Sequence, residues 1–268
     1  MKIILSRKGF DSANGGIPSP IMPNGTLLSM PIPSDDNVCY DDLLYDEMTY
    51  SEILGQLAPR KRFSQCHVDP DIRENCRKER IQQWIPAFGQ IGSAQGVLNH
   101  ANVEIGDIFL FFGWFRKTEF YNGQFRFIRK NNGDFYEHSD LHIIYGYMQI
   151  GEIITDKDQI AKFTWHPHSR NTRLENNSNT LYLPSEALSI LPGFPGYGTL
   201  NYRTDRVLTM KGQKRATWNE LPFLLPEHIY GKRKNAAKER GLYYNGIWQE
   251  LVINESEGLL DWVKSIIK

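Results

Sequence analysis

Two uninterrupted apolar stretches in the middle of the chain predict strands that are buried on both faces. Residues Asp107–Phe115 read DIFLFFGWF after Gly106, and residues His142–Ile154 read HIIYGYMQIGEII. Short apolar runs bounded by a turn residue are typical of strands that are covered on each side. An internal glycine in a strand often marks a bulge, so we expect one at Gly146 or Gly151.

Shorter patterns predict the elements near the two ends of the chain. Met1–Leu5 is apolar enough for a short opening strand. Thr49 and Glu52 have the spacing of a capping box and predict a short helix that ends at about Leu57. A C-terminal helix should take Ser256 as its N-cap. The apolar residues of this helix recur with helical spacing at Leu259, Leu260, Val263, Ile266 and Ile267.

The segments between these elements predict an ordered loop and a hairpin. Residues 11–25 contain six glycines and prolines, which are too many for a helix. Phe125, Phe127 and Tyr136 should belong to a hairpin after the first buried strand. Its turn is expected at Asn132-Gly133, because Asn-Gly pairs favour the tight turns of hairpins.

Composition indicates a folded protein with a sizeable core, since the 268 residues are 40% hydrophobic and 23% charged. No composition change marks a boundary, so we predict one α+β domain over residues 1–268, strand-rich, with two lobes and an amphipathic C-terminal helix. Three cysteines are too few for a disulfide framework.

No apolar run approaches the roughly 18 residues of a membrane span. The N-terminal apolar stretch is too short for a signal peptide, so we expect a cytoplasmic protein with no membrane partner.

Charge is balanced overall but unevenly spread. The 31 basic and 31 acidic residues cancel, which argues against a protein that coats nucleic acid by bulk charge. Residues 1–55 carry three basic and eight acidic side chains (net −5), and residues 200–240 carry ten basic and four acidic ones (net +6). Either these regions balance each other, or the basic one, with Lys232, Arg233 and Lys234, docks phosphates or an acidic partner.

The loop after the opening strand carries the first candidate binding residues. Arg7 offers a planar fork of donors and Lys8 a point charge, and both suit a phosphate. Asp11 could accept a hydrogen bond from a ribose hydroxyl or a base amine, and the amides of Gly15 and Gly16 could approach an anion as a nest. The loop matches neither glycine-rich nucleotide motif. Alternatively it is structural, with Asp11 closing a turn and Arg7 paired to an acidic neighbour.

The opening string MKIILSRKGFDSANGGIPSPIMPNGTLLSMPIPS resembles the start of the nucleotide modification associated domain family of the third type. The similarity continues through Cys66-His67-Val68-Asp69-Pro70-Asp71 and Gly89-Gln90 and extends over most of the chain. This resemblance implies a link to modified nucleotides or DNA, with DNA-modifying and phage-defence enzymes as partners. It implies no settled reaction and assigns no catalytic residue.

His67, Asp69 and Asp71 alternate along the chain. In an extended segment this spacing places all three side chains on one face, where they could bind a ligand, hold a divalent metal or act as a base with an orienting carboxylate. Alternatively, Asp69 or Asp71 caps a solvated helix over Ile72–Trp84, and both roles can hold at once. Because one strand rarely supplies a complete shell, we assign no metal ligand and leave the cofactor unknown.

A proline separates two further histidines, His166 and His168, and keeps their segment extended. The segment is either a second pair of metal ligands or an exposed loop. A joint site with His67 and Asp69 would complete a metal shell, but spacing along the chain cannot show whether these residues meet. Cys66 cannot form a nucleophile–base pair with its neighbour His67, because adjacent residues of a strand point to opposite faces.

A second resemblance, of pattern only, covers about residues 88–160. The order of a Gly-Asp turn, a buried strand, a hairpin and a later strand is similar to that of PUA-like domains of the ASCH and EVE types, which hold a flipped base in a small barrel. Trp114 could provide a stacking face, and Gln90 could read a base edge. Further aromatic and polar residues could contribute to such a pocket or simply belong to the core and to a helix cap: Phe115, Tyr145, Tyr147, Ser93 and Gln95.

These observations support three functional hypotheses. The first is a protein that binds a modified nucleotide or base beside modification enzymes. Its substrate-binding residues would be Arg7, Lys8, Asp11, Gly15, Gly16, Asp71, Gln90 and Trp114. The second is a nucleotide-directed hydrolase or transferase in which Asp11, His67 or Asp69 is the general acid or base. The third is a non-enzymatic assembly subunit whose basic region 200–240 docks DNA or an acidic partner.

Overall fold

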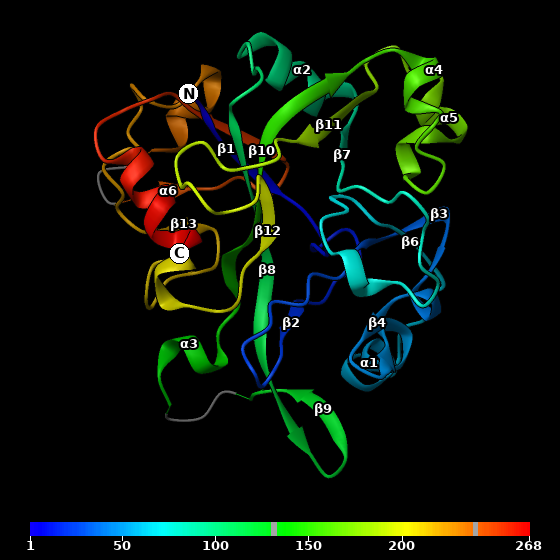
Figure 1. Ribbon diagram of the computed structural model, residues 1–268. Helices are drawn as coiled ribbons and strands as arrows, with labels where there is room; N and C mark the ends of the chain where they lie inside the picture. The colour runs from blue at the N-terminus through cyan, green and yellow to red at the C-terminus, as the bar shows by residue number, and fades with distance from the viewer. Residues whose placement is uncertain (130–132, 238–240) are drawn as a thin grey trace.

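The computed structural model describes residues 1–129, 133–237 and 241–268, and a mixed sheet forms its centre. Within the described part the strands of this sheet are β1 (Ile3–Arg7), β2 (Ser19–Ile21), β7 (Phe88–Gln90), β8 (Ile108–Tyr121), β9 (Gln124–Phe127), β10 (Leu141–Ile154), β11 (Thr180–Pro184), β12 (Tyr197–Thr199) and β15 (Glu250–Ile253). The main path runs β15-β1-β8-β10-β11-β7, with β12 on β10 and with β2 and β9 on β8. The long strands β8 and β10 carry the sheet through a half-barrel curl (Figure 1).

Strands that are neighbours in the sheet come from distant parts of the sequence. β1 runs parallel to β8, with Leu5 opposite Leu110, and antiparallel to β15 on its other side. β10 runs antiparallel to β8, and its register shifts between Ile144 and Gly146. A second shift occurs where β10 pairs with β11. The two predicted buried strands, the opening strand and the predicted bulge are therefore confirmed.

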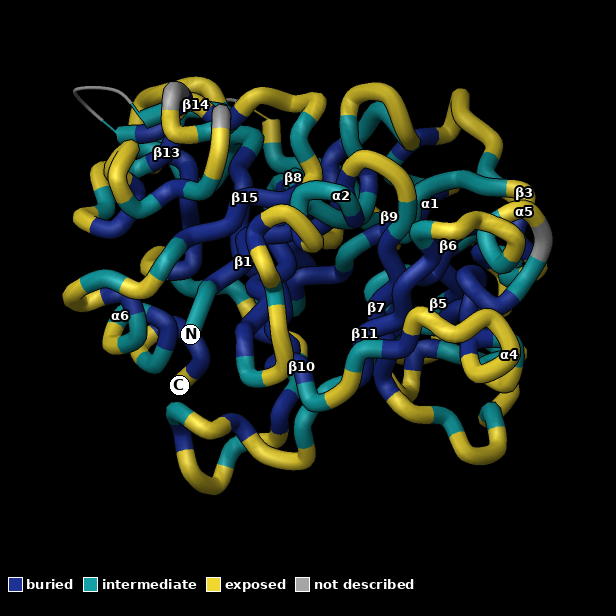
Figure 2. Tube along the Cα trace, turned by 90° about the horizontal axis from the view of Figure 1, so that it is seen from above, coloured by how far each residue is buried: buried dark blue, intermediate teal, exposed yellow. Residues whose placement is uncertain are grey.

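Successive side chains of β8 enter two different hydrophobic cores. Ile108, Leu110 and Phe112 pack against the C-terminal third of the chain. Phe109 and Phe111 pack on the opposite face of the sheet, and all five side chains are fully buried. Burying a side chain of this size contributes about 1.5–3 kcal/mol relative to leaving it exposed. Figure 2 shows the same arrangement, with buried central strands and exposed outer loops.

The C-terminal part of the chain covers the first of these cores. It contains β13 (Thr217–Trp218), β14 (Leu242–Tyr243) and α6 (Leu259–Ile267). The rings of Trp218 and Tyr244 stack there with their centroids 4.7 Å apart. The predicted C-terminal helix is confirmed, but its N-cap is Gly258 with a φ of 76° rather than Ser256. A left-handed residue suits glycine because no Cβ clashes with the backbone.

A second lobe lies on the other side of the sheet, to the right in Figure 1. It consists of β3 (Ile32–Cys39), β4 (Leu44–Tyr45), β5 (Met48–Thr49), α1 (Tyr50–Leu57) and β6 (Gln65–His67). The predicted capping box of α1 is confirmed: the Glu52 N–H donates to Thr49 Oγ1 at 3.0 Å, and the Thr49 N–H donates to Glu52 Oε2 at 2.7 Å. β3 and β6 pair antiparallel with Ile32 opposite His67, which fixes the position of His67 at the end of its strand.

The remaining elements of the described residues are short. They are α2 (Gly92–His100), α3 (Phe135–His138), α4 (Lys157–Ile160), α5 (Asn171–Leu174) and the 3-10 turns η1 (Tyr40–Asp42), η2 (Glu74–Cys76), η3 (Pro167–Ser169), η4 (Thr204–Arg206) and η5 (Gly231–Ala236). No helix in the described ranges has both the length and the apolar character needed to span a bilayer. Residues 88–160 supply β7 to β10 of the curled sheet, and their PUA-like resemblance stays a prediction, as does the single-domain organisation.

The predicted hairpin exists, but its turn is not the predicted one. The turn between β8 and β9 is Asn122-Gly123, with φ angles of 50° and 79°, and Phe120 pairs with Phe125 across it. Tyr136 belongs to the short helix α3 instead. Asn132, the first residue of the predicted turn, lies outside the described residues.

The expected helix over Ile72–Trp84 is wrong, and this stretch contains only the turn η2. Its backbone is used by a neighbouring segment: Arg77 bridges to Leu43, and the Lys78 N–H donates to the Asp42 carbonyl at 2.9 Å. A backbone that pairs sideways in this way cannot also form the hydrogen bonds of a helix. The many charged residues of the stretch also give it no apolar face for a helix to bury.

Candidate functional site

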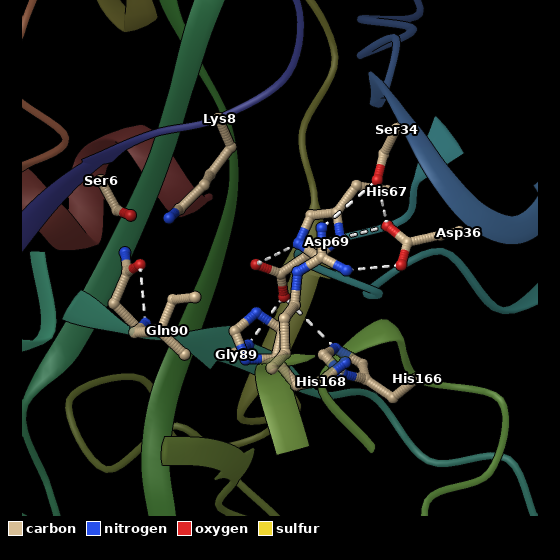
Figure 3. A network of polar contacts seen from close by, with 12 residues as sticks. Ser6, Lys8, Ser34, Asp36, His67, Asp69, Gly89, Gln90, His166 and His168 are labelled. Atoms are coloured by element: carbon tan, nitrogen blue, oxygen red, sulfur yellow. Dashed lines mark hydrogen bonds and ion pairs between the residues drawn. The ribbon is translucent and has the colours of Figure 1, made fainter. Parts of the chain in front are cut away.

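A cavity of about 200 Å³ opens after the end of β1, between the main sheet and the second lobe. The cavity lies where the loop after β1, the end of β6, the end of β7 and the turn η3 meet. Figure 3 shows Lys8 on one side and the histidine cluster on the other. The side chains and glycines that line the cavity include Arg7, Lys8, Asp11, His67, Asp69, Gly89, Gln90, His168 and Arg173.

His67 is oriented by a carboxylate from β3. Its Nδ1 lies 2.9 Å from Oδ2 of Asp36, which also receives the Ser34 hydroxyl at 2.6 Å, while Arg173 donates to Oδ1 at 2.5 Å. Burial raises the pKa of Asp36, but the hydrogen bonds from His67 and Ser34 and the charge of Arg173 outweigh it and lower the pKa to about 2. An ionised carboxylate only accepts hydrogen bonds, so Nδ1 of His67 carries a proton and Nε2 is the nitrogen left for other contacts.

His168 is held in the same way by an amide. Its Nδ1 lies 2.7 Å from Oδ1 of Asn179, and the Asn179 Nδ2 donates to the His168 backbone carbonyl at 2.9 Å. Because the amide nitrogen is already used, Oδ1 must accept a proton from Nδ1, and the lone pair of His168 lies on Nε2. Burial lowers the pKa of His168 to about 3 against the opposing charge of Asp69, so the ring is neutral at physiological pH.

Asp69 lies between the imidazoles and is almost completely buried. Its Oδ1 accepts the Gly89 N–H at 2.7 Å and lies 3.3 Å from His166 Nε2, and its Oδ2 lies 3.8 Å from His67 Nε2. Burial raises the pKa of Asp69, but the contact with His166 and the surrounding imidazoles outweigh it and hold the pKa well below its usual range. This carboxylate is therefore ionised in a buried site.

His166 is fully buried behind this carboxylate and does not line the cavity. Its Nδ1 accepts the backbone N–H of His168 at 3.3 Å, so its proton lies on Nε2. That Nε2 lies close to Asp69, but the contact is too bent to satisfy it as a full hydrogen bond. His67, Asp69, His166 and His168, whose meeting the sequence left open, do come together.

Gly89 makes room for the cluster. A Cβ at this position would fall 2.3 Å from the ring of His168, which is closer than any real contact. The Gly89 N–H also fixes Asp69. The end of β7 therefore positions two side chains of the cluster. Gly89 leaves space for the His168 ring because it has no side chain, and its N–H holds Asp69.

The chain matches the family model described as nucleotide modification associated domain 3 over residues 2–254. It belongs to this family. The cavity and every side chain that surrounds it lie within the matched range. No curated protein and no solved structure matches the chain. Membership of the nucleotide modification associated domain 3 family places the chain in the context of nucleotide modification systems and confirms the resemblance of its opening residues.

In this family member only the first part of the N-terminal loop, up to Asn14, lines the cavity. Arg7 donates to Asp11 Oδ2 at 2.9 Å, and Asp11 Oδ1 accepts the amides of Ala13 and Asn14, which closes a turn. Hydrogen bonds from the backbone and from Arg7 outweigh burial and lower the pKa of Asp11. These contacts are those of the structural alternative, in which Asp11 closes a turn and Arg7 pairs with an acidic neighbour. Arg7 and Asp11 also line the cavity wall.

Gly15 and Gly16 do not line the cavity. The Gly16 N–H donates to the Asp11 carbonyl at 2.9 Å, and the Gly15 carbonyl accepts Lys61 Nζ at 2.6 Å. The amide of Gly16 is therefore used within the loop itself, and the anion nest expected from the sequence stays a prediction. The φ of 83° at Gly15 instead lets the ring of Phe10 pack against it, since a Cβ there would fall 2.4 Å from that ring.

Asp71 does not share a face with His67 and Asp69, contrary to the expectation from their spacing. The Asp69 N–H donates to the His67 carbonyl at 3.0 Å, so the chain turns here and the alternation of an extended strand is lost. Asp71 is buried elsewhere, where Arg77 donates to both of its oxygens at 3.0 and 2.7 Å. Trp84 Nε1 adds a third hydrogen bond at 3.0 Å, so this carboxylate is fully engaged.

Lys8 and Gln90 belong to a polar cluster around the buried Glu250. Lys8 Nζ lies 3.3 Å from Glu250 Oε1, which also accepts Gln90 Nε2 at 2.7 Å and the Ser6 hydroxyl at 3.0 Å. Glu250 is fully buried, and its Oε2 has no hydrogen-bond partner among the described residues. Gln90 and Lys8 thus combine a structural contact with a place on the cavity wall.

The aromatic residues expected to stack on a base do not line this cavity. The guanidinium of Arg215 lies 3.9 Å from the ring centroid of Trp114. Phe115, Tyr145 and Tyr147 are buried in the hydrophobic cores, as the core interpretation of these strands predicts. Gln95 donates to the Tyr182 hydroxyl and to Asn99, which is also a structural role, and Ser93 is exposed on α2 outside the cavity lining.

Several arginines of the basic region 200–240 make contacts inside the molecule. Arg206 donates to the Ile266 carbonyl at 2.7 Å, and Arg203 pairs with Asp205. Arg215 also contacts the Ser12 hydroxyl, so part of the basic region packs against the acidic N-terminal region. The side chain of Lys232 lies outside the described residues, as do Lys238 and Arg240.

Sequence reasoning missed four residues of the site. They are Asp36, Arg173, Asn179 and Glu250, which hold His67, Asp36, His168 and Lys8 respectively. None stands in a local pattern that indicates its partner, because the contact between Arg173 and Asp36 spans 137 residues of sequence. Cys66 is buried, and burial raises the pKa of its thiol, which agrees with its exclusion as a nucleophile.

Proposed function

We propose that this protein binds a nucleotide, or the modified base of one, in the cavity between the N-terminal loop and the histidine cluster. One observation carries the proposal: cationic and hydrogen-bonding residues from the loop after β1 line the same cavity as His67, Asp69 and His168. Convergence of a few polar groups from distant segments on one concave site is the usual mark of a ligand pocket. Membership of the nucleotide modification associated domain 3 family supports a nucleotide as the ligand.

The groups on the two sides of the cavity suit different parts of a nucleotide. Arg7 and Lys8 provide donors for a phosphate, and Asp11 accepts from a sugar hydroxyl. The Gln90 amide donates to Glu250 and accepts the Ile91 N–H, and its remaining N–H and lone pair suit a base edge. The volume of about 200 Å³ is below the range of about 300–1,000 Å³ that is typical of pockets for drug-sized ligands. The cavity therefore suits a base or one part of a single nucleotide rather than a dinucleotide.

Small molecules that co-purify with the protein provide the first test. Mass spectrometry of the denatured wild-type protein should detect a nucleotide, and the Arg7→Gln variant should retain at least about tenfold less of it. Arg126→Gln is the matched control, because Arg126 pairs with Glu119 on the hairpin away from the cavity. Equal amounts of nucleotide in the wild type and in Arg7→Gln would contradict the proposal.

A nucleotide-directed hydrolase or transferase is the second candidate, and one observation favours it. His67 is paired through Nδ1 with the ionised carboxylate of Asp36, and its Nε2 is not used in that contact, which is the arrangement of an oriented general acid or base. In an enzyme, His67→Gln should abolish turnover with little loss of affinity, whereas in a binding protein it should weaken binding alone.

A further inference from the structure

We propose that His67, Asp69 and His168 bind one divalent transition metal ion, with Zn²⁺ or Fe²⁺ as the chemical class. One donor atom from each of the three side chains lies within 4.8 Å of the other two. Donor atoms that share one ion at about 2.0–2.2 Å lie about 3–4 Å from each other. The 3.8 Å between His67 Nε2 and Asp69 Oδ2 already fits that spacing. Binding of an ion would have to draw the third donor from within 4.8 Å to that spacing.

The hydrogen bonds behind the histidines point to a metal. His67 gives its Nδ1 proton to Asp36, and His168 gives its Nδ1 proton to Asn179. Each ring therefore uses its Nδ1 in a hydrogen bond and leaves its Nε2 for another partner. A histidine that binds a metal through one nitrogen usually donates from the other to a carboxylate or a carbonyl oxygen, which fixes both the tautomer and the ring. An acid–base site needs only one such imidazole, whereas this site has two.

The charge balance of the buried carboxylate supports the same conclusion. Asp36 is neutralised by Arg173, but no lysine or arginine in the described ranges pairs with Asp69. A buried ionised carboxylate is costly unless a cation or several hydrogen bonds compensate it. The Gly89 N–H and the bent contact from His166 compensate Asp69 only in part. A divalent ion between Asp69 and the two imidazoles supplies the missing charge.

The donor set selects the class of metal. Mg²⁺ and Ca²⁺ prefer oxygen ligands, whereas imidazole nitrogen suits zinc and iron. Two histidines and one carboxylate leave coordination positions open, as in catalytic rather than structural zinc sites and as in ferrous sites. His67, Asp69 and His168 all line the cavity, so a ligand in the cavity can reach those open positions. His166 remains outside the lining and orients Asp69.

Metal binding is tested without any nucleotide, so its outcome is independent of the proposed function. Metal-free protein is titrated with Co²⁺, a spectroscopic substitute for Zn²⁺, and the bound metal is counted by elemental analysis. We expect one ion per chain with the visible absorption of a nitrogen- and oxygen-ligated site, displaced by Zn²⁺. Asp69→Asn and His168→Ala should weaken Co²⁺ binding at least about 100-fold. Asp36→Asn, which leaves the three proposed ligands in place but changes the partner of His67, should weaken it about 10–100-fold.

Two further variants separate metal ligation from a structural role. His100→Ala is the matched control, because His100 lies exposed on α2 away from the cavity, and it should bind Co²⁺ as the wild type does. His168→Cys should add a thiolate-to-cobalt charge-transfer band, which only direct ligation produces. Folding of each variant is checked by circular dichroism. Absence of Co²⁺ and Zn²⁺ binding by the folded wild type, or unchanged binding by folded His168→Ala, would overturn the proposal.

Discussion

The ring of His168 lies directly against the backbone of Gly89, at a distance that leaves no room for a Cβ at position 89. The same glycine donates its N–H to Asp69 at 2.7 Å. The last residues of one edge strand therefore set the positions of an imidazole and a carboxylate that come from two other segments. The geometry of the candidate site depends on a residue that has no side chain.

Replacing Gly89 with alanine should therefore displace His168. Overpacking of a filled site costs about 1–3 kcal/mol, so we expect a loss of that size in the free energy of unfolding, measured by chemical denaturation. Gly96→Ala on α2 is the control, because a Cβ there meets nothing within 4 Å. A helical Gly→Ala change that fits should stabilise by about 0.4–1 kcal/mol. Equal stability of the wild type and Gly89→Ala would contradict the close packing.

Asp36 should make stability depend on pH at the acid end. Its folded pKa of about 2 lies below the unfolded value of 3.8, so its contribution is complete above pH 4 and is lost as the pH falls toward 2. The shift corresponds to about 2 kcal/mol at most. The difference in unfolding free energy between the wild type and Asp36→Asn should shrink over that window. A difference that stays constant from pH 5 to pH 2 would argue against this contribution.

His168 should resist protonation in the folded state. Its folded pKa of about 3 lies below the ordinary 6.5, so the unfolded chain takes up the proton first. The fold is therefore expected to lose stability progressively as the pH falls from 6.5 toward 3. In an NMR titration, the ring resonances of His168 should keep their neutral positions down to about pH 4. Titration of this ring near pH 6.5 would show that it is not buried as described.

Arg77 and Asp71 form a buried pair away from the cavity, which provides a test of the corrected role of Asp71. Removing one partner of a buried pair leaves an uncompensated charge and costs about 3–5 kcal/mol. Arg77→Met should lower the unfolding free energy by that amount. Where the variant remains folded, its affinity for a nucleotide should equal that of the wild type. A loss of nucleotide affinity in the folded variant would instead indicate that Asp71 contributes to nucleotide binding.

Local patterns predicted the elements that local physics controls. The apolar strand at Asp107–Phe115 and the capping box at Thr49 are confirmed because neighbouring residues determine them. The sequence predicts the hairpin turn at the wrong Asn-Gly pair, since Asn122-Gly123 and Asn132-Gly133 have the same turn preference and periodicity does not choose between them.

Sequence patterns predict only those residues of the site that lie close together along the chain. Alternation placed His67 and Asp69 together as candidates, but it also included Asp71, because the pattern does not reveal the turn that the Asp69 N–H closes. Asn179 and Asp36 decide which nitrogen of each histidine is free, and both reach their partners through folding alone. Contacts of this kind depend on sheet topology, which one sequence does not display.

The most direct test of the shared cavity is isothermal titration of the protein with single nucleotides, comparing variants from its two sides. Arg7→Gln removes a donor from the N-terminal loop, and His67→Gln changes the histidine cluster, while Arg126→Gln is the control outside the cavity. If one nucleotide contacts both sides, each cavity variant should weaken binding at least about tenfold, and the control should not. A wild type that binds none of the nucleotides, or binding that neither cavity variant weakens, would contradict the account.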